Sequence, residues 1–233
     1  MKKILVTTSW DDGHILDKRI ARLLFKYGLK GTFYVSPRNR EFSKESLLSD
    51  KDIINLSKYF EIGAHTFTHP DLTEICTDEA RKEISESKNY LEKLTGKKIR
   101  SFCYPKGRYT PEIRDIISEI GFSYARTVKR FNFRKSSDDL QSATGVDCYK
   151  HYQDIFKLLM FSDWKISVFL RNMDWENFAK SAFDKLKGGH IYHLWGHSWI
   201  IDKRNEWRKL ERLLKYISRK PNAIYLENNE LSR

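Results

Sequence analysis

The sequence has only three cysteines. Cys76, Cys103 and Cys148 form no CxxC pair and are odd in number, so no disulfide framework is implied, which fits a reducing compartment. No stretch approaches the roughly 20 consecutive apolar residues that a membrane span requires. The apolar run within residues 1–6 is too short for a signal peptide, and acidic residues follow soon after it. We therefore expect a cytoplasmic protein without a membrane span.

The sequence also has fewer acidic than basic residues. The chain has 31 Asp and Glu against 43 Lys and Arg, which gives a net charge of +12. A basic excess indicates a polyanion partner when it is concentrated in one place. Here no block of five or more like charges occurs, so we expect a solvated lysine-rich surface and no nucleic-acid partner. Linkers, low-complexity segments and internal repeats are missing too, which favours one domain over residues 1–233.

What is present is an alternation of apolar runs of strand length with amphipathic segments of helix length. Strands are expected at residues 4–9, 32–35, 61–64, 101–104, 124–127, 191–195 and 223–226. Helices are expected at residues 16–27, 49–58, 77–95, 111–120, 175–186 and 206–218. Residues 128–165 are less regular, with an irregular strand near 143–146 and a helix near 154–161. This order predicts a parallel sheet with covering helices, either a barrel or an open sheet.

Two adjacent acids, Asp11 and Asp12, follow the first predicted strand. Neighbouring carboxylates repel each other and lose solvation on burial unless a cation or a proton stabilises them. The carboxyl ends of parallel strands meet at one face of such a fold. His65, residues 105–107 and His197 also follow predicted strands, so we expect all of these groups to converge.

A second informative stretch contains His65 and His69, followed by Pro70. Histidines four residues apart lie on one face when the segment is helical. Pro70 disfavours the helical conformation at His69, so a loop that brings both rings to one ion is predicted. A carboxylate from Asp11 or Asp12 would complete a His-His-Asp set with one position open, which is typical of a catalytic zinc site.

Three segments together resemble a known family. Residues 9–13 (SWDDG), 65–69 (HTFTH) and 102–107 (FCYPKG) resemble the first three motifs of the polysaccharide deacetylase domain, also called the NodB homology domain or carbohydrate esterase family 4. The resemblance implies a single-domain, distorted (β/α)7-type barrel. It also implies a divalent metal, with zinc expected, and hydrolysis of an N-acyl group, with N-acetyl expected, on an amino sugar or polysaccharide.

The resemblance also implies roles for the matched residues. The first acid of the family's pair is the general base, here Asp11. The second is a metal ligand, here Asp12, together with His65 and His69. A free carboxylate beside a metal site is suited to accept the proton of the attacking water.

Further roles fall on the third motif and on a late histidine. The resemblance implies that Lys106 offers its backbone N–H to the oxyanion, and Gly107 would let the backbone approach closely. The family also has a histidine that protonates the leaving amine. We favour His197, which lies past a strand and after a glycine, and His193 is the alternative.

The sequence departs from the family at two places. Cys103 stands where the family usually has an arginine that orients the base. Arg126, at the end of the fifth predicted strand, is the preferred substitute, and Arg100 is the alternative. The tryptophan-containing fourth motif is not clear, with residues 163–164 and 174–175 (both Asp-Trp) as candidates.

Several alternatives remain open from the sequence. The same architecture serves deformylases of lipid-linked sugars and allantoinase-like amidases. Cys103 and the unclear fourth motif also allow a non-catalytic carbohydrate-binding protein with a degenerate site. In each sugar-related case the partner is a carbohydrate. Four aromatic residues are either core or a platform for a sugar: Phe131, Phe133, Trp195 and Trp199.

Overall fold

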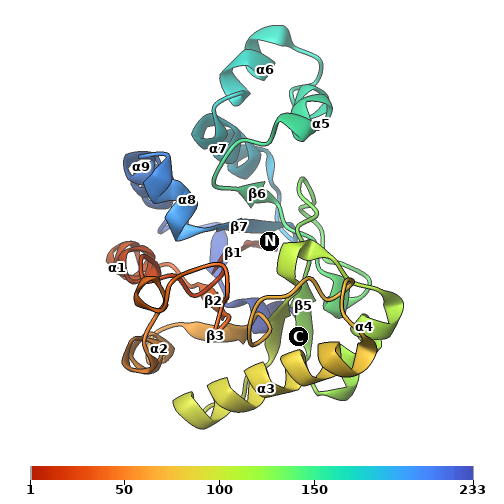
Figure 1. Cartoon of the computed structure of the whole chain (residues 1–233). Helices are drawn as coiled ribbons and strands as arrows, with labels where there is room; N and C mark the ends of the chain where they lie inside the picture. The colour runs from red at the N-terminus through yellow and green to blue at the C-terminus, as the bar shows by residue number, and fades with distance from the viewer. Residues whose placement is uncertain (1, 233) are drawn as a thin grey trace.

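A computed structural model describes residues 2–232. Its strands all belong to one sheet, and neighbouring strands are parallel. The strands are β1 (Ile4–Trp10), β2 (Thr32–Val35), β3 (Glu61–Ala64), β4 (Ser101–Cys103), β5 (Tyr124–Arg126), β6 (Val146–Asp147), β7 (Ile191–Gly196) and β8 (Ala223–Tyr225). The main path runs β5-β4-β3-β2-β1-β7-β6, and the sheet curls into a half-barrel surrounded by helices (Figure 1). The predicted distorted (β/α)7-type barrel is confirmed.

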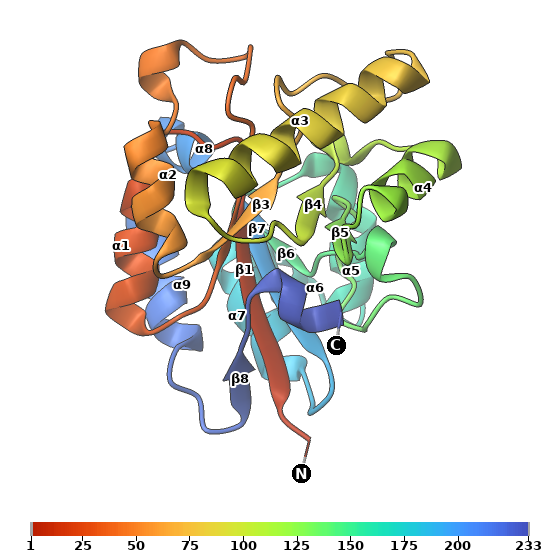
Figure 2. The same ribbon diagram turned by 90° about the horizontal axis from the view of Figure 1, so that it is seen from below.

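β1 pairs with three other strands, β2, β7 and β8 (Figure 2). It pairs with β7 along nearly its whole length, from Leu5 to Trp10. On its other edge it pairs with β8 at Ile4–Val6 and with β2 only at Ser9 and Trp10. The last strand therefore fills the part of the β1 edge that β2 leaves free, and lies off the barrel path.

The two ends of the sheet path, β5 and β6, are joined through an irregular segment at residues 142–145. The Ser142 amide donates to the carbonyl of Ala125 on β5 at 2.9 Å. The Gly145 amide donates to the carbonyl of His193 on β7 at 3.2 Å. The predicted irregular strand near 143–146 is thus this bridging segment followed by the short β6.

The helices cover the outside of the sheet (Figures 1 and 2). They are α1 (Asp17–Tyr27), α2 (Asp50–Ser57), α3 (Thr77–Thr95), α4 (Pro111–Glu119), α5 (Ile155–Phe161), α6 (Ile166–Asn172), α7 (Trp175–Lys185), α8 (Ser198–Lys203) and α9 (Trp207–Ile217). Local signals explain several ends. Ser49 and Asp52 form a capping box at α2, and Thr110 caps α4, which begins with Pro111. Gly28, in the left-handed conformation, ends α1.

Two short helices, α6 and α8, were not predicted. α6 has seven residues, and Asn172 is its only buried one, so its apolar side chains do not face the core. α8 has six residues and begins directly after the β7 turn. Elements of this length carry too few periods to be recognised from the sequence.

The interior of the barrel is partly polar. Thr7 donates to Asn228 at 2.7 Å, and Ser9 lies 2.8 Å from Nε2 of His193, all within the buried interior.

Across residues 2–232, none of the helices combines the length and the apolar character that crossing a membrane requires.

Candidate functional site

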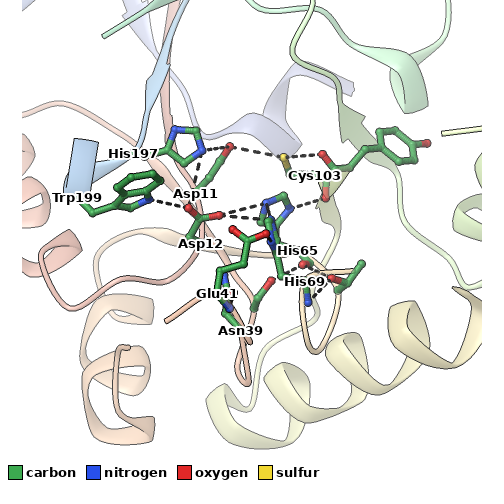
Figure 3. A network of polar contacts seen from close by, with 12 residues as sticks. Asp11, Asp12, Asn39, Glu41, His65, His69, Cys103, His197 and Trp199 are labelled. Atoms are coloured by element: carbon green, nitrogen blue, oxygen red, sulfur yellow. Dashed lines mark hydrogen bonds and ion pairs between the residues drawn. The ribbon is translucent and has the colours of Figure 1, made fainter. Parts of the chain in front are cut away.

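The turn after β1 separates the two adjacent carboxylates. Asp12 adopts φ 81° and Gly13 φ 69°, and a Cβ at Gly13 would lie 2.9 Å from Cγ1 of Val35. Asp11 and Asp12 are only 2% and 3% exposed. Because the chain turns sharply between them, Asp12 faces the two histidines while Asp11 faces a different set of partners (Figure 3).

The histidine loop after β3 has the irregular shape that Pro70 predicts. Thr66 (φ 62°) and His69 (φ 66°) both have left-handed backbone conformations, which few non-glycine residues adopt. The loop is held by the carboxylate of Glu83, which accepts from the amides of Phe67 and Thr68 at 2.9 and 2.8 Å. It places the rings of His65 and His69 at 4.7 Å between centroids.

Asp12, His65 and His69 converge on one point. Oδ1 of Asp12 lies 3.7 Å from Nε2 of His65 and 3.5 Å from Nε2 of His69. The two Nε2 atoms are 3.2 Å apart. These three atoms form a group that fits the donor requirements of a metal ion (Figure 3).

The hydrogen bonds behind the rings support this fit. Nδ1 of His65 lies 2.7 Å from the carbonyl oxygen of Cys103, which only accepts, so Nδ1 carries the proton. Nδ1 of His69 lies 3.2 Å from Oε1 of Glu41, close enough for an ion pair, although the angle is poor for a hydrogen bond. The lone pair on Nε2 of His65 then faces Nε2 of His69 and the Asp12 carboxylate, an arrangement that a cation stabilises. Burial, and next the neighbouring His69, lower the pKa of His65 to about 4, which keeps this ring neutral as a metal ligand must be.

His65 also forms a close triad with Asp11 and Cys103. Burial raises the pKa of the Cys103 thiol well above its usual range, so the sulfur stays protonated. The thiol lies 3.8 Å from Oδ2 of Asp11 as a weak donor. A thiol is a poor ligand, and the Asp12 set fits a metal better.

Asp11 has a cationic partner in Arg126. Nη2 of Arg126 contacts Oδ1 of Asp11, and both side chains are buried. Burial alone would raise the pKa of Asp11, but Arg126, and next His65 and His197, lower it below its usual value. The guanidinium lies between the rings of Tyr34 and Trp195, 5.1 and 4.7 Å from their centroids. Arg126 therefore occupies the place proposed for a substitute of the motif-three arginine.

The structure separates the two candidate acids. Nε2 of His197 lies 3.9 Å from Oδ2 of Asp11 and 3.8 Å from Oδ2 of Asp12, and its Nδ1 lies 3.0 Å from the hydroxyl of Tyr149. His193 lies inside the barrel on β7, against Ser9. Burial, and next Arg126, lower the pKa of His193 to about 3, so this ring is neutral.

The third motif forms a tight turn after β4. Lys106 adopts φ 56° and Gly107 φ 69°. A Cβ at Gly107 would lie 2.3 Å from Cγ2 of Val128, so only glycine fits here. The Lys106 side chain is exposed, and its backbone lies in this turn.

Three contacts of the site were not foreseen. The indole N–H of Trp199 donates to Oδ2 of Asp12 at 2.8 Å, and Tyr149 and Glu41 contact the histidines as described above. Trp199 lies in α8, whereas Tyr149 and Glu41 lie in separate loops. His-Ser-Trp at residues 197–199 was the one available signal, because it places an indole two residues after a candidate acid.

The other tryptophans and phenylalanines have different roles. Trp164 is 60% exposed in the turn between α5 and α6, and Trp175 donates to Glu206 at 2.9 Å. Phe131 packs on Phe178 in the core. Within residues 2–232, no polar contact joins Trp164 or Trp175 to the carboxylate site. The assignment of the family's fourth motif to either position stays a prediction.

A curled parallel sheet with carboxylates and imidazoles at the carboxyl ends of its strands defines a class: (β/α) barrels with clustered Asp and His side chains at one end. Residues 1–125 match the family model described as "Polysaccharide deacetylase". The chain belongs to the polysaccharide deacetylase family.

Characterised relatives and a solved structure agree with this assignment. The chain is 28% identical over 112 residues to peptidoglycan-N-acetylmuramic acid deacetylase PdaC of Bacillus subtilis. The matched segment covers 47% of this chain and 23% of the relative. It is 34% identical over 61 residues to the chitooligosaccharide deacetylase of Azorhizobium caulinodans. That match covers 26% of this chain and 29% of the relative. The chain thus spans less than a third of the length of either protein. A family 4 acetyl xylan esterase from Clostridium thermocellum, solved with a cobalt ion, has the same fold, with TM-score 0.62 and 17% identity over 97% of this chain and 89% of that one.

Proposed function

We propose that this protein is a metal-dependent hydrolase that removes the acetyl group from an N-acetylated amino sugar. The observation that carries the proposal is that the adjacent carboxylates of Asp11 and Asp12 face different partners. Asp12 faces the imidazoles of His65 and His69, while Asp11 faces a buried arginine and His197. Membership of the deacetylase family supports the same chemistry.

The proposed ion is held by Asp12, His65 and His69. Nitrogen and oxygen donors in this ratio suit zinc. Such an ion supplies Lewis acidity, which polarises an amide carbonyl and favours deprotonation of water. The indole of Trp199 fixes Oδ2 of Asp12, so that Oδ1 remains directed at the histidines.

The other residues move protons and hold charge. Asp11, kept ionised by Arg126, accepts a proton from the attacking water as the new C–O bond forms. The Lys106 amide donates to the oxygen that gains negative charge. His197, oriented through Nδ1 by Tyr149, gives a proton from Nε2 to the nitrogen as the C–N bond breaks. The products are acetate and a free amino sugar.

Three variants and one control test the proposal. Asp11→Asn should lose activity and keep metal, whereas Asp12→Ala and His65→Ala should lose both. His190→Ala is the matched control, because His190 lies before β7, at the opposite end from the site. The measurements are bound metal by mass spectrometry and acetate released from chitin oligomers. A metal-free His65→Ala protein with full activity would refute the proposal.

A further inference from the structure

Exposed apolar side chains are concentrated in one segment of the chain. Of the eleven large hydrophobic side chains exposed in residues 2–232, seven lie within residues 152–170. We call them the α5–α6 surface: Tyr152, Ile155, Phe156, Met160, Trp164, Ile166 and Leu170. Exposed fractions run from 41% at Ile155 to 76% at Tyr152. Such a concentration marks a surface that is covered by something, since isolated exposed hydrophobics are otherwise scattered.

Packing within the protein does not account for this surface. Leu158 is the only buried residue of α5, and Asn172 the only one of α6. The two helices project outward beyond α7 and away from the sheet (Figure 1). Phe156 and Trp164 contact each other edge to face at 5.9 Å, yet are 63% and 60% exposed. The rings form a ridge on the outside of the molecule.

The α5–α6 surface adjoins the candidate site. α5 follows β6, so it emerges at the carboxyl ends of the strands, where the site lies. Tyr149, whose hydroxyl contacts His197, lines a small cavity together with Ile155 and Leu158 of α5. An object that covers this surface therefore lies beside the entrance to the site.

The charges around the surface are basic. Both acids of the segment already have cationic partners, Asp154 with Arg130 at 2.5 Å and Asp163 with Lys185 at 2.8 Å. Three basic residues in or beside the segment have no carboxylate partner within residues 2–232: Lys150, Lys165 and Arg171. An anionic partner would satisfy these charges.

We propose that the α5–α6 surface docks on an anionic lipid bilayer. Aromatic side chains flanked by lysine and arginine are the composition of segments that lie in a membrane interface. The net charge of +12 adds attraction to an anionic surface. A second copy of the chain fits less well, because a two-fold contact would bring the same unpaired cations together. This docking is separate from the proposed function and requires no catalysis.

Vesicle co-sedimentation of the full chain tests the proposal. The vesicles are phosphatidylcholine alone, or phosphatidylcholine with about 30% phosphatidylglycerol. The protein should bind the anionic vesicles, and added salt should weaken binding. The triple variant Phe156→Ser/Trp164→Ser/Leu170→Ser should bind at least about tenfold more weakly. Lys150→Gln and Lys165→Gln should each weaken binding about fivefold, on anionic vesicles only.

A matched control is available on α1 and the α2–β3 loop. Phe25 and Tyr59 are 67% and 61% exposed and contact each other at 5.7 Å, but lie outside the α5–α6 surface. Phe25→Ser/Tyr59→Ser should bind vesicles as the parent does. Thermal melting of each variant checks that the fold is retained.

Three results would overturn the proposal. The first is no binding to either vesicle by the folded parent protein. The second is equal binding by the parent and the triple variant. The third is a dimer in sedimentation velocity that the triple variant abolishes while vesicles remain unbound, which would assign the surface to a second copy.

Discussion

The first 125 residues and the rest of the chain contribute to the site through different parts of their structure. The early segments act through the backbone: Asp12, Thr66, His69 and Lys106 all have positive φ in the turns that present the functional groups. The later segments act through single side chains, such as His197 and the residues that orient it. A strained turn restricts several consecutive positions at once, whereas a hydrogen-bonding side chain restricts only one.

The family match ends at residue 125, so it covers these four turn positions and not the later side chains. Consecutive constraints produce a motif that can be recognised, and isolated ones do not. Substitutions at contacts between residues 1–125 and the later segments, or in the early turns, test this contrast. Their expected effects decrease from Arg126 to Asp17.

The largest effect is expected for Arg126→Met. Asp11 would remain buried without its cation, and breaking such a pair destabilises a protein by about 3–5 kcal/mol. In the parent, the lowered pKa of Asp11 contributes stability that is present above its unfolded pKa and lost as pH falls through its folded pKa. In the variant, burial dominates and the pKa of Asp11 rises, so the acid limb of the pH–rate profile should move to higher pH.

Denaturant unfolding and the pH dependence of acetate release measure the Arg126→Met effect. Arg81→Met is the control, because its partner Glu119 is 60% exposed and the pair contributes less than about 1 kcal/mol. An acid limb that stays in place in Arg126→Met would show that Arg126 does not set the ionisation of Asp11.

A smaller effect is expected for Gly107→Ala. The new Cβ would meet Val128 at 2.3 Å and also impose a positive φ on alanine, with a combined cost of about 1–3 kcal/mol. Activity should fall as well, because the turn carries the Lys106 amide. Unfolding by urea and acetate release are the measurements.

Gly121→Ala separates the backbone penalty of a positive φ from the steric clash with Val128. Gly121 has φ 89° and no atom within 4 Å of a new Cβ, so its substitution should show the backbone penalty alone. Adding Val128→Ala to Gly107→Ala should recover the part due to the clash. If the double variant recovers nothing, steric contact with Val128 is not the cause.

Trp199→Phe should weaken metal binding about 10- to 100-fold with little change in stability. The variant keeps a ring beside Phe42 and His197 but removes the donor to Asp12. Competition with a chromophoric chelator measures the affinity. Trp207→Phe is the matched control, since its indole donates to Asp202 at 2.8 Å outside the site. Equal affinity in both variants would mean that the indole does not orient the ligand.

The sequence predicted the part of the site that lies in motifs. Asp12, His65 and His69 meet as expected because strand ends converge and Pro70 excludes a helix. Arg126 was found as the charge that Cys103 does not provide, because it ends the strand next to that cysteine. The roles assigned to these residues remain predictions.

The remaining partners could not be predicted. Tyr149 and Trp199 reach the site only because β6 and β7 lie side by side, which is long-range information. The helices α6 and α8 were missed for their short length. The α5–α6 surface could not be predicted because its residues resemble core residues in hydrophobicity. Only the fold shows that they face outward.

The smallest effect is expected for Asp17→Asn, which tests the contact between α1 and α8. Asp17 is buried and accepts from the hydroxyl of Ser198 at 2.5 Å, and its Oδ2 has no hydrogen-bond partner among residues 2–232. Burial raises the pKa of Asp17 well above 3.8. The folded state therefore binds the proton more tightly than the unfolded state, so the stability that Asp17 contributes is lost as pH rises from about 4 toward its folded pKa.

Asparagine keeps the acceptor for Ser198 and does not titrate. Metal-free Asp17→Asn should match the parent near pH 4 and exceed its unfolding free energy at pH 8, by on the order of 1 kcal/mol. Urea unfolding at both pH values, with a chelator present, measures the difference. Asp115→Asn, at a carboxylate that is 64% exposed, should show no such pH dependence. A parent that gains stability relative to Asp17→Asn as pH rises would mean that Asp17 is ionised in the fold, and that α1 and α8 are joined by a charged hydrogen bond.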